Sequence, residues 1–412
     1  MTAAVRILRL AAGGDGVGRL EDGRAVFVPR TAPGDLVEIS QVRTQRRYAR
    51  ARVARVLEPS PGRVEPRCPH YVQDDCGGCQ LQHLEGAAQR EARRGFVGDA
   101  FRRIARLDAR DPDIVPAAGE FEYRTKITLA VDDGGQRIGL HPLDRPDRVF
   151  DLVRCHITTS ELMSLWAEVR SVRELLPAAL RQIVLRLDRR GGLHLLLVME
   201  GPDGWQGAGA LHRALADRGS SATIWLQAEG GSAEARAAAG AGVATPFPAT
   251  VFEQVHPAMG DEVRAFALAA LGQVEGRHVW DLYAGIGETT SALILAGASV
   301  ESVESDPHAV AEAEARGPAA VRHVGRVERV LGRMRRPSLV ITNPPRTGMD
   351  QRVTAELERL SPTRVVYISC DPATLARDLT RLPGFRLANA VAFDLFPQTA
   401  HVETVAVLDR AS

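Results

Sequence analysis

The sequence predicts a multi-domain protein with a small N-terminal β-barrel, a central α+β domain and a C-terminal doubly wound α/β domain. Three observations support this prediction. The chain has 412 residues, too many for one ordinary hydrophobic core. Short strand patterns separated by turns fill the first part of the chain. A strand, a glycine loop and a helix start follow one another near residue 280. We therefore expect domains over 1–58, 59–245 and 246–412.

The composition is that of a globular protein without a strong overall charge. Hydrophobic residues make up 45% and charged residues 25% of the chain. The formal net charge of +1 excludes a uniformly basic nucleic-acid binder, so any RNA contact must come from local patches. No apolar run is long enough to span a bilayer, and the start of the chain shows no secretion signal. We expect a cytoplasmic protein without a membrane or protein partner, and a monomer.

The first 58 residues alternate as short strands with turns between them, which is typical of an OB-like barrel. Strand patterns cover 5–10, 25–29, 35–39 and 48–56, and residues 21–24 form a hairpin turn. An arginine run containing one aromatic residue accompanies the later strands: Arg43, Arg46, Arg47, Tyr48, Arg50, Arg52 and Arg55. Such a run binds RNA through phosphate contacts and base stacking, or else forms a solvated outer strand face.

Four of the five cysteines indicate a metal site. Cys68, Cys76 and Cys79 stand close together, and two glycines between the last two let the backbone fold tightly around a metal. In a reducing compartment, metal binding is favoured over disulfides. Three sulfurs need a fourth, and Cys155 is the free candidate. Four thiolates suit Zn²⁺ or a 4Fe–4S cluster, and the single Cys-x-x-Cys pair favours iron–sulfur. The alternative is a set of unrelated cysteines.

The middle of the chain mixes helix and strand patterns, which indicates an α+β domain. Residues 84–107 form an arginine-rich amphipathic helix, which we expect to pack on the C-terminal domain. Residues 229–245 are rich in glycine and alanine and are expected to be a loop before the next domain. Strands are expected over 121–131, 182–187, 193–199 and 222–226, and helices over 160–176 and 207–218.

The C-terminal domain begins with a nucleotide-type loop. Residues 277–290 predict a strand, a glycine loop and a helix start, in which Gly285 and Gly287 allow a tight turn and close approach to a ligand. About twenty residues later, Glu304 ends the second strand, where an acid can hold a pair of ribose hydroxyls. The loop lacks the third glycine of the dinucleotide fingerprint, which favours S-adenosylmethionine over NAD.

Cys370 follows a strand of β-branched residues and precedes a helix that Pro372 opens. Ligands bind at this edge of an open α/β sheet, and the helix dipole favours the thiolate, which is the nucleophilic form of cysteine. The alternative is a buried structural cysteine. The final strand pattern places His401 and Glu403 on one face. For Glu403 alone, the alternative is an exposed acid on an edge strand.

Together these segments resemble the RNA 5-methyluridine methyltransferases, in the branch that carries an iron–sulfur cluster and a TRAM domain, which is an RNA-binding module. The resemblance covers nearly the whole chain and implies an S-adenosylmethionine-dependent RNA (uracil-C5-)-methyltransferase with a Rossmann-like catalytic domain. Its substrate would be a uridine in 23S rRNA, which this branch favours, or in tRNA. The matching motifs are Cys-Gly-Gly-Cys-Gln-Leu-Gln-His, Phe-x-Gln, Asp-Leu-Tyr-x-Gly-x-Gly, Pro-Pro-Arg-x-Gly, Ser-Cys-x-Pro-x-Thr-Leu-Ala-Arg-Asp-Leu and Phe-Pro-Gln-Thr-x-His-Val-Glu.

The resemblance also implies residue roles. Cys370 would add to carbon 6 of the uracil, and Glu403 would remove the proton from carbon 5. Arg346 and Asp394 would order the uracil or the cysteine loop, whereas His401 is expected to be a surface residue. The residues expected to bind S-adenosylmethionine are Gln254, Tyr283, Gly285, Gly287, Glu288, Glu304 and Asn343.

The sequence departs from the family pattern at several positions, most of them near the expected cofactor site. Two alternatives follow. Asn-Pro-Pro motifs also occur in amino-group methyltransferases, but these have an aromatic residue where Arg346 stands and do not need Cys370. A non-catalytic RNA-binding or folding module with a decayed methyltransferase domain is also possible, although Cys370 and Glu403 argue against it. The departures are His256, Arg326, Asn343 and Asp371.

Overall fold

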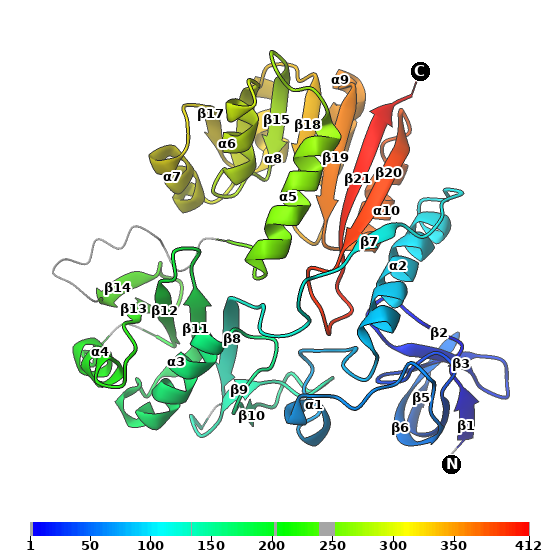
Figure 1. Cartoon of the computed structure of the whole chain (residues 1–412), viewed down its shortest axis with the longest axis vertical. Helices are drawn as coiled ribbons and strands as arrows, with labels where there is room; N and C mark the ends of the chain where they lie inside the picture. Colours follow the sequence, from blue (N-terminus) through cyan, green and yellow to red (C-terminus); the bar gives the residue numbers. More distant parts are fainter. Residues whose placement is uncertain (1–2, 133, 202–203, 239–251, 412) are drawn as a thin grey trace. The chain divides into compact units, whose positions relative to one another are not determined.

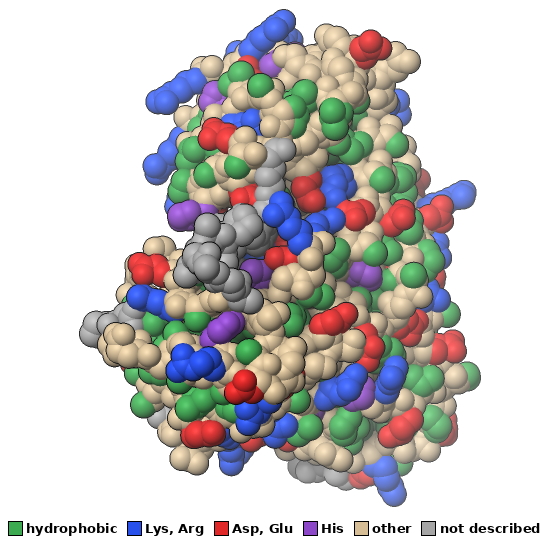
Figure 2. All heavy atoms as spheres, turned by 60° about the vertical axis from the view of Figure 1, so that its left-hand side comes forward, with side chains coloured by type: hydrophobic (Ala, Val, Ile, Leu, Met, Phe, Trp, Pro, Cys, Tyr) green, Lys and Arg blue, Asp and Glu red, His purple; other side chains and the backbone are tan. Residues whose placement is uncertain are grey.

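The computed structural model describes residues 3–132, 134–201, 204–238 and 252–411 (Figure 1). The chain divides into two compact units, each built from segments that are distant in the sequence. The first unit comprises 1–89, 119–250 and 397–400, and the second comprises 90–118, 251–396 and 401–412. Within the described residues, no helix is long and apolar enough to cross a membrane. Charged side chains of both signs are interspersed on the face drawn in Figure 2, as the net charge of +1 predicts.

The first unit opens with a six-stranded sheet in the order β1-β5-β6-β4-β3-β2. Alternate side chains such as Val26, Val37 and Ile39 point inward and form a closed apolar core. The strand expected over 5–10 is two strands, because β1 pairs with β5 whereas β2 pairs with β3. The strands are β1 (Ala3–Arg6), β2 (Arg9–Leu10), β3 (Gly16–Arg19), β4 (Ala25–Val28), β5 (Leu36–Thr44) and β6 (Tyr48–Glu58).

A seven-stranded sheet, β10-β9-β8-β11-β12-β13-β14, forms the rest of the first unit. Helices α3 and α4 cover one face of it, and residues such as Trp166 and Leu211 pack against the strands. The loop expected over 229–245 contains β14, and its residues 239–245 lie outside the described residues. The elements are α1 (Pro69–Gln73), β8 (Lys126–Val131), β9 (Ile138–Leu140), β10 (Phe150–Asp151), α3 (Ser160–Ser171), a 3₁₀ turn (Arg173–Leu175), β11 (Leu180–Leu187), β12 (Leu193–Met199), α4 (Ala208–Ala216), β13 (Thr223–Gln227) and β14 (Glu234–Ala237).

The second unit is built on an eight-stranded sheet in the order β17-β16-β15-β18-β19-β21-β20-β7. Strands β15 to β19 are parallel, and β21 lies antiparallel between β19 and β20. The chain order reverses between β15 and β18, where such sheets bind ligands. The strands are β7 (Asp113–Val115), β15 (His278–Leu282), β16 (Ser299–Glu304), β17 (Val321–Val324), β18 (Leu339–Thr342), β19 (Arg364–Ser369), β20 (Phe385–Phe393) and β21 (Glu403–Arg410).

Helices cover both faces of this sheet, as expected for a doubly wound fold (Figure 1). Apolar residues of α5 and α6 pack on one face, and those of α2, α8, α9 and α10 pack on the other. The helices are α2 (Gly86–Arg103), α5 (Pro257–Leu271), α6 (Glu288–Leu295), α7 (Pro307–Arg316), α8 (Val327–Val330), a 3₁₀ turn (Leu331–Arg333), α9 (Gln351–Leu360) and α10 (Pro372–Thr380).

The unit boundaries differ from the continuous ranges expected from the sequence. Residues 90–118 lie within the expected central domain but belong to the second unit. The reason is packing: Val97 and Phe101 of α2 join the core that contains Trp280, and β7 extends the sheet beside β20. From residue 90 onward, α2 therefore belongs to the second unit.

Candidate active site

Cys370 lies at the carboxyl edge of the second sheet. Strand β19 ends at Ser369, and α10 begins at Pro372. Asp371, which departs from the family pattern, is the N-cap of α10, because its carboxylate accepts a hydrogen bond of 2.8 Å from the Thr374 N–H. The thiol is therefore fixed between a buried strand and a capped helix, where the sequence predicted it.

Glu403 lies opposite Cys370. In the antiparallel pair β19–β21, Ser369 is in register with Thr404, so the next position outward pairs Cys370 with Glu403. Glu403 is 1% exposed, and β21 has a neighbouring strand on each side. The alternative of an exposed acid on an edge strand is therefore wrong. Burial raises the pKa of Glu403 to about 8, and Arg346 acts in the opposite direction.

The Cys370 thiol is not activated by its position alone. Burial is the largest cause that raises its pKa, to about 11, and the Glu403 charge raises it further. Arg346 lowers the pKa of both groups. Burial therefore acts against the helix dipole, which favours the thiolate. Arg346 is thus the cation placed to stabilise negative charge on either group.

The loop that carries Arg346 is tied to α10 by a buried carboxylate. Asp378 is fully buried, and its Oδ2 accepts hydrogen bonds from the Met349 N–H at 2.7 Å and the Tyr367 hydroxyl at 2.8 Å. Gly348 has a φ of 75°, and a Cβ there would lie 2.5 Å from Asp378 Oδ2. Asp378 is not among the residues predicted from the sequence; the signal for it is an acid on the apolar face of a short helix, which needs buried partners.

The loop after β15 has the backbone of a ligand-binding turn. Positive φ angles occur at Tyr283 (63°), Gly285 (55°) and Gly287 (76°). The carboxylate of Glu304, at the end of β16, accepts a hydrogen bond of 2.9 Å from the Gly285 N–H. Asn343 follows β18 at the same edge, and its N–H donates to the Leu282 carbonyl at 3.1 Å. A left-handed tyrosine is costly, so this turn is held by its surroundings.

The two other residues of the expected cofactor set, Gln254 and Glu288, also lie in the second unit, as does His256. Glu288 is the first residue of α6 and pairs with Arg264 of α5. Gln254 precedes α5, and Gly260 makes room for it, because a Cβ at residue 260 would lie 2.9 Å from Gln254 Cβ. His256, where the family pattern has Asn, caps α5 by accepting from the Met259 N–H, and burial lowers its pKa. This departure therefore has a structural role.

The four cysteines of the expected metal site lie close enough for their charges to interact. Cys68, Cys76 and Cys79 are buried and Cys155 is half-buried. Burial raises the pKa of the first three thiols, and Cys155 raises each of them further. Among the described residues, no group of three His, Cys, Asp or Glu side chains is arranged to hold a single metal ion. Four sulfurs around one Zn²⁺ would have to lie within about 4 Å of one another.

Asp394 and His401 are placed differently from Cys370 and Glu403. Asp394 forms a buried ion pair with Arg93 of α2 at 2.8 Å, and each side chain is 1% exposed. Its carboxylate therefore fastens α2, and the expectation that Asp394 orders the uracil or the cysteine loop stays a prediction. Leaving one partner of such a pair alone would cost about 3–5 kcal/mol. His401 is exposed, as expected, and its ring lies edge-on to Phe396.

The segment just before Glu403 is anchored in the first unit. Residues 397–400 belong to that unit, although they lie between β20 and β21 of the second unit's sheet. The amide of Gln89 exchanges two hydrogen bonds with Gln398, at 2.9 and 3.0 Å, and the Leu81 N–H donates to the Gln398 carbonyl at 3.0 Å. The Tyr123 hydroxyl donates to the carbonyl of residue 397 at 2.9 Å. This anchoring lies beside the cysteines, because Tyr123 packs with Cys68 and Cys79.

Comparison with known proteins supports one family over the whole chain. The family model for tRNA (uracil-5-)-methyltransferase matches residues 309–411, and the TRAM domain model matches residues 2–54. A 23S rRNA (uracil(1939)-C(5))-methyltransferase of Thiobacillus denitrificans is 31% identical, covering 100% of both chains. An RNA methyltransferase of Thermosynechococcus vestitus, whose activity is uncharacterized, is 33% identical over 99% of this chain and 98% of its own.

One solved structure has the same fold from end to end. The Pyrococcus abyssi tRNA (uracil-54, C5)-methyltransferase, in complex with S-adenosyl-L-homocysteine, matches with a TM-score of 0.73 over 99% of each chain. The sequence identity is 23%, so this likeness bears on the fold alone. It confirms the combination of the N-terminal barrel with a methyltransferase fold that the sequence predicted.

Proposed function

Because this chain belongs to the family of RNA (uracil-5-)-methyltransferases, we propose that it transfers a methyl group from S-adenosylmethionine to carbon 5 of a uridine in RNA. The observation that supports this most is the register that sets Cys370 opposite a buried Glu403, with Arg346 acting on both. 23S rRNA is the favoured substrate, because a relative of that name aligns with the whole chain. tRNA is the second candidate, because the matching family model and the solved structure carry tRNA in their names.

In the proposed mechanism, Cys370 first loses its thiol proton to water, and the resulting thiolate forms a bond to carbon 6 of the uracil. The electron pair of the 5,6 double bond moves toward the carbonyl at carbon 4. Carbon 5 thereby becomes a nucleophile. S-adenosylmethionine, when bound, supplies an electrophilic methyl group. Glu403 then removes the proton from carbon 5, the double bond re-forms, and the bond between sulfur and carbon 6 breaks. The target base must leave its stack for this, so a flipped or single-stranded uridine is implied.

The chain's own residues fit the cofactor. The turn at Tyr283–Gly287 brings its backbone to the edge of the sheet, and Glu304 lies where an acid holds ribose hydroxyls. In the proposed complex, Gln254, Glu288 and Asn343 complete the site. The departure at Asn343 removes a negative charge from this edge, and its backbone N–H is held by the Leu282 carbonyl.

We further propose that Cys68, Cys76, Cys79 and Cys155 hold a 4Fe–4S cluster. The thiols are close enough for their charges to interact, and the single Cys-x-x-Cys pair favours a cluster of several irons over Zn²⁺. When bound, the cluster would fasten together three segments of the first unit. We assign it a role in folding or RNA docking, because the proposed methyl transfer needs no electron transfer.

The two alternatives are less well supported. An amino-group methyltransferase has no use for a thiol facing a buried acid, and the residue after its Asn-Pro-Pro motif is aromatic rather than Arg346. A decayed, non-catalytic module would have no reason to retain Cys370, Glu403 and Arg346 in one place. We also propose that the protein acts in the cytoplasm, where ribosomal and transfer RNA are made. We further propose that it acts as a monomer.

The proposed function predicts one missing methyl group in the RNA of a strain that lacks this gene. Ribosomal and transfer RNA from the deletion strain and its parent would be digested and analysed by mass spectrometry. One uridine in 23S rRNA of the deletion strain should be lighter than in the parent by about 14 mass units, because methylation adds a net CH₂ group. Restoring the gene should restore the methyl group. Unchanged RNA in every class would reject the proposal.

The cluster proposal predicts about four irons and four sulfides per chain in protein purified without oxygen. Cys155→Ser should lose a large part of that iron, because the fourth ligand is gone. Cys370→Ser is the matched control: it also removes one cysteine, but from outside the group, and should keep its full iron content. Zinc in place of iron in the anaerobic protein would contradict the assignment.

A further inference from the structure

The direction in which the Glu403 carboxylate points is not set by hydrogen bonds at its outer oxygen. Oε2 of Glu403 is buried and has no hydrogen-bond partner in the described part of the chain. Burial and the charge of Arg346 shift the pKa of this carboxyl. Because Glu403 is the first residue of β21, the position of its side chain depends on the backbone that enters this strand.

That backbone passes through a left-handed conformation at Gln398, where φ is 71°. Such a conformation is unfavourable for a residue other than glycine, so the surrounding contacts must stabilise it. All four polar groups of the buried Gln398 are bonded. Its N–H and its side-chain oxygen bond to the Gln89 amide, its carbonyl accepts from the Leu81 N–H, and its Nε2 donates to Glu120 at 3.3 Å. These hydrogen bonds hold the turn.

The amide of Gln89 is fixed in one orientation. Its Nε2 donates to the Leu84 carbonyl at 2.9 Å as well as to Gln398, and its oxygen accepts from the Gln398 N–H. Two donors and one acceptor are therefore in use, and the side chain is 1% exposed. Rotation of this amide would leave buried polar groups without partners, which is costly.

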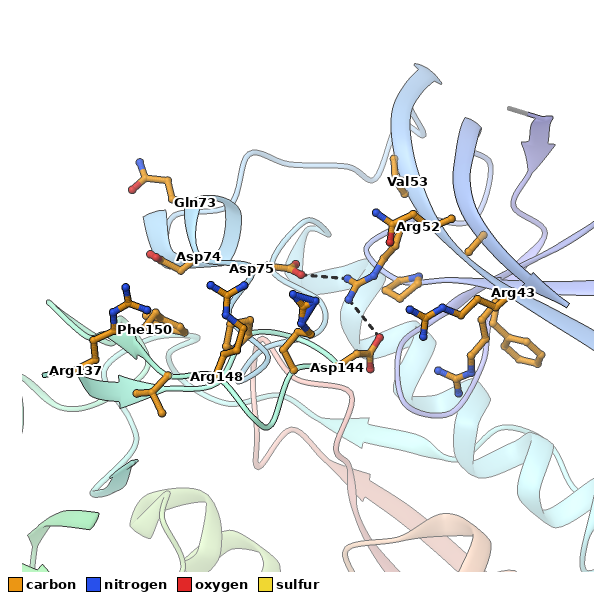
Figure 3. Close-up of a pocket in the computed structure, with 18 of the residues that line it drawn as sticks. Arg43, Arg52, Val53, Gln73, Asp74, Asp75, Arg137, Asp144, Arg148 and Phe150 are labelled. Atoms are coloured by element: carbon orange, nitrogen blue, oxygen red, sulfur yellow. Dashed lines mark hydrogen bonds and ion pairs between the residues drawn. The ribbon is translucent and has the colours of Figure 1, made fainter. Parts of the chain in front are cut away.

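The chain segment that presents Leu81 is also held within the first unit. Arg52 pairs with Asp75 at 3.2 Å (Figure 3), and Arg30 pairs with the same aspartate at 3.1 Å. The Leu143 N–H donates to the Asp75 carbonyl at 2.7 Å. The segment from residue 75 to Leu81 thus starts from a fixed point, which helps to keep the Leu81 N–H in place for Gln398.

Both ends of the segment 397–400 are held as well. The Tyr123 hydroxyl donates to the carbonyl of residue 397 at 2.9 Å, and the Ala400 N–H donates to the Gln80 side-chain oxygen at 3.2 Å. Two residues, 401 and 402, separate this held segment from Glu403, and neither belongs to a helix or strand. A displacement of the segment would therefore be passed on to the carboxylate.

We propose that Gln89 is a positioning residue for proton removal: by holding Gln398 in its left-handed conformation, it sets the backbone from which Glu403 reaches carbon 5 of the uracil. The proposal rests on the function proposed above. Gln89 acts through Gln398 and touches no reacting atom. Cys370 is placed by β19 and by the capped helix α10 instead, so the loss of Gln89 should slow proton removal and leave the addition of sulfur unchanged.

The test uses Gln89→Met, which keeps the length of the side chain but removes its donors and its acceptor. Unmodified RNA and S-adenosylmethionine are mixed with the full-length protein under single-turnover conditions, and denaturing gels follow the RNA attached to Cys370. Attachment should proceed at the wild-type rate. Release of methylated RNA should be about 10- to 100-fold slower, the scale on which small misplacements act, so the attached species should accumulate. Release should still rise with pH up to about 8, because Glu403 remains the base.

Two further variants make the result specific. Tyr123→Phe removes one hydroxyl from the same anchoring and should slow release by about threefold, as expected for one hydrogen bond; it supplies the test if Gln89→Met does not fold. Trp225→Phe is the control, because it removes a buried N–H that donates to His194 at 3.1 Å in the same unit. It should lower the melting temperature without accumulation of the attached species.

Equal slowing of attachment and release in Gln89→Met, or accumulation in Trp225→Phe, would show that Gln89 serves only the fold and would overturn the proposal. Release at the wild-type rate in both Gln89→Met and Tyr123→Phe would overturn it as well, and an active wild-type protein would leave the proposed function intact. A wild-type protein that neither methylates RNA nor is trapped by 5-fluorouridine would instead reject the proposed function, and this inference with it.

Discussion

Replacement of Cys370 by serine is expected to reduce methylation by at least about 10⁴-fold, the scale on which removal of a covalent nucleophile acts. A hydroxyl at this position would lie in the same buried setting but cannot form the nucleophilic anion near neutral pH. The measurement is transfer of a labelled methyl group to RNA under single-turnover conditions. RNA affinity of the variant should equal that of the wild type, which shows that the fold is intact.

A covalent intermediate is the sharpest evidence for this role. RNA that carries 5-fluorouridine at the target should become bound to the wild-type protein with S-adenosylmethionine present, because fluorine cannot leave as a proton does. The bond should survive denaturing electrophoresis and map to Cys370 by peptide mass. Cys370→Ala should give no such product. Methylation that proceeds at the wild-type rate in Cys370→Ser would remove the central step of the mechanism.

Glu403→Gln is expected to trap the same intermediate on ordinary uridine. The amide keeps the shape of the side chain but cannot accept the proton from carbon 5, so turnover should fall by about 10²- to 10⁴-fold while methylated RNA stays attached to Cys370. Denaturing gels of protein mixed with unmodified RNA would show the attached species. Glu403→Asp, which keeps a carboxylate one methylene further away, should turn over slowly and accumulate less of it. Free turnover in Glu403→Gln would assign the proton to another group.

The pH dependence of the wild-type enzyme should follow from the same carboxylate. The base must be ionised to work, and burial raises the pKa of Glu403 to about 8. At pH 6 most of the enzyme therefore holds the proton, and the rate at which methylated RNA is released from Cys370 should rise with pH up to about 8, where a base with the usual pKa of glutamate would give no rise in this range. In Glu403→Gln, the slow residual release should lose this rise.

Local sequence patterns predicted the catalytic edge well. Strand residues followed by Cys370 and Pro372 specify a strand, a turn and a helix start from neighbouring residues alone, and the structure has all three. The glycine loop and Glu304 were likewise predicted from spacing, because the doubly wound fold brings consecutive strand ends to one edge. The roles of these residues in catalysis and binding remain predictions.

Long-range pairing was not predictable in the same way. The partnership of Arg93 with Asp394 joins residues 301 positions apart, and nothing near either residue specifies the other. The protonation of Cys370 is a similar case, since the sequence shows the helix that favours a thiolate but not the burial and the neighbouring Glu403 that oppose it. Burial of charge depends on the packed whole, and sequence position alone does not give it.

The four residues 397–400 tie the last strand of the second unit to the first unit, because they connect β20 to β21 yet belong to the first unit. A shortened protein that began at residue 251 would contain Cys370, Glu403 and the cofactor turn, yet it would lack Gln89, Leu81 and Tyr123, which hold the stretch leading into the final catalytic strand. If the first unit is replaced by that of a relative, the new segment must therefore supply side chains that form the same hydrogen bonds with Gln398. Gene fusions and chimaeras of this chain should keep residues 80–123 and 397–400 from the same parent.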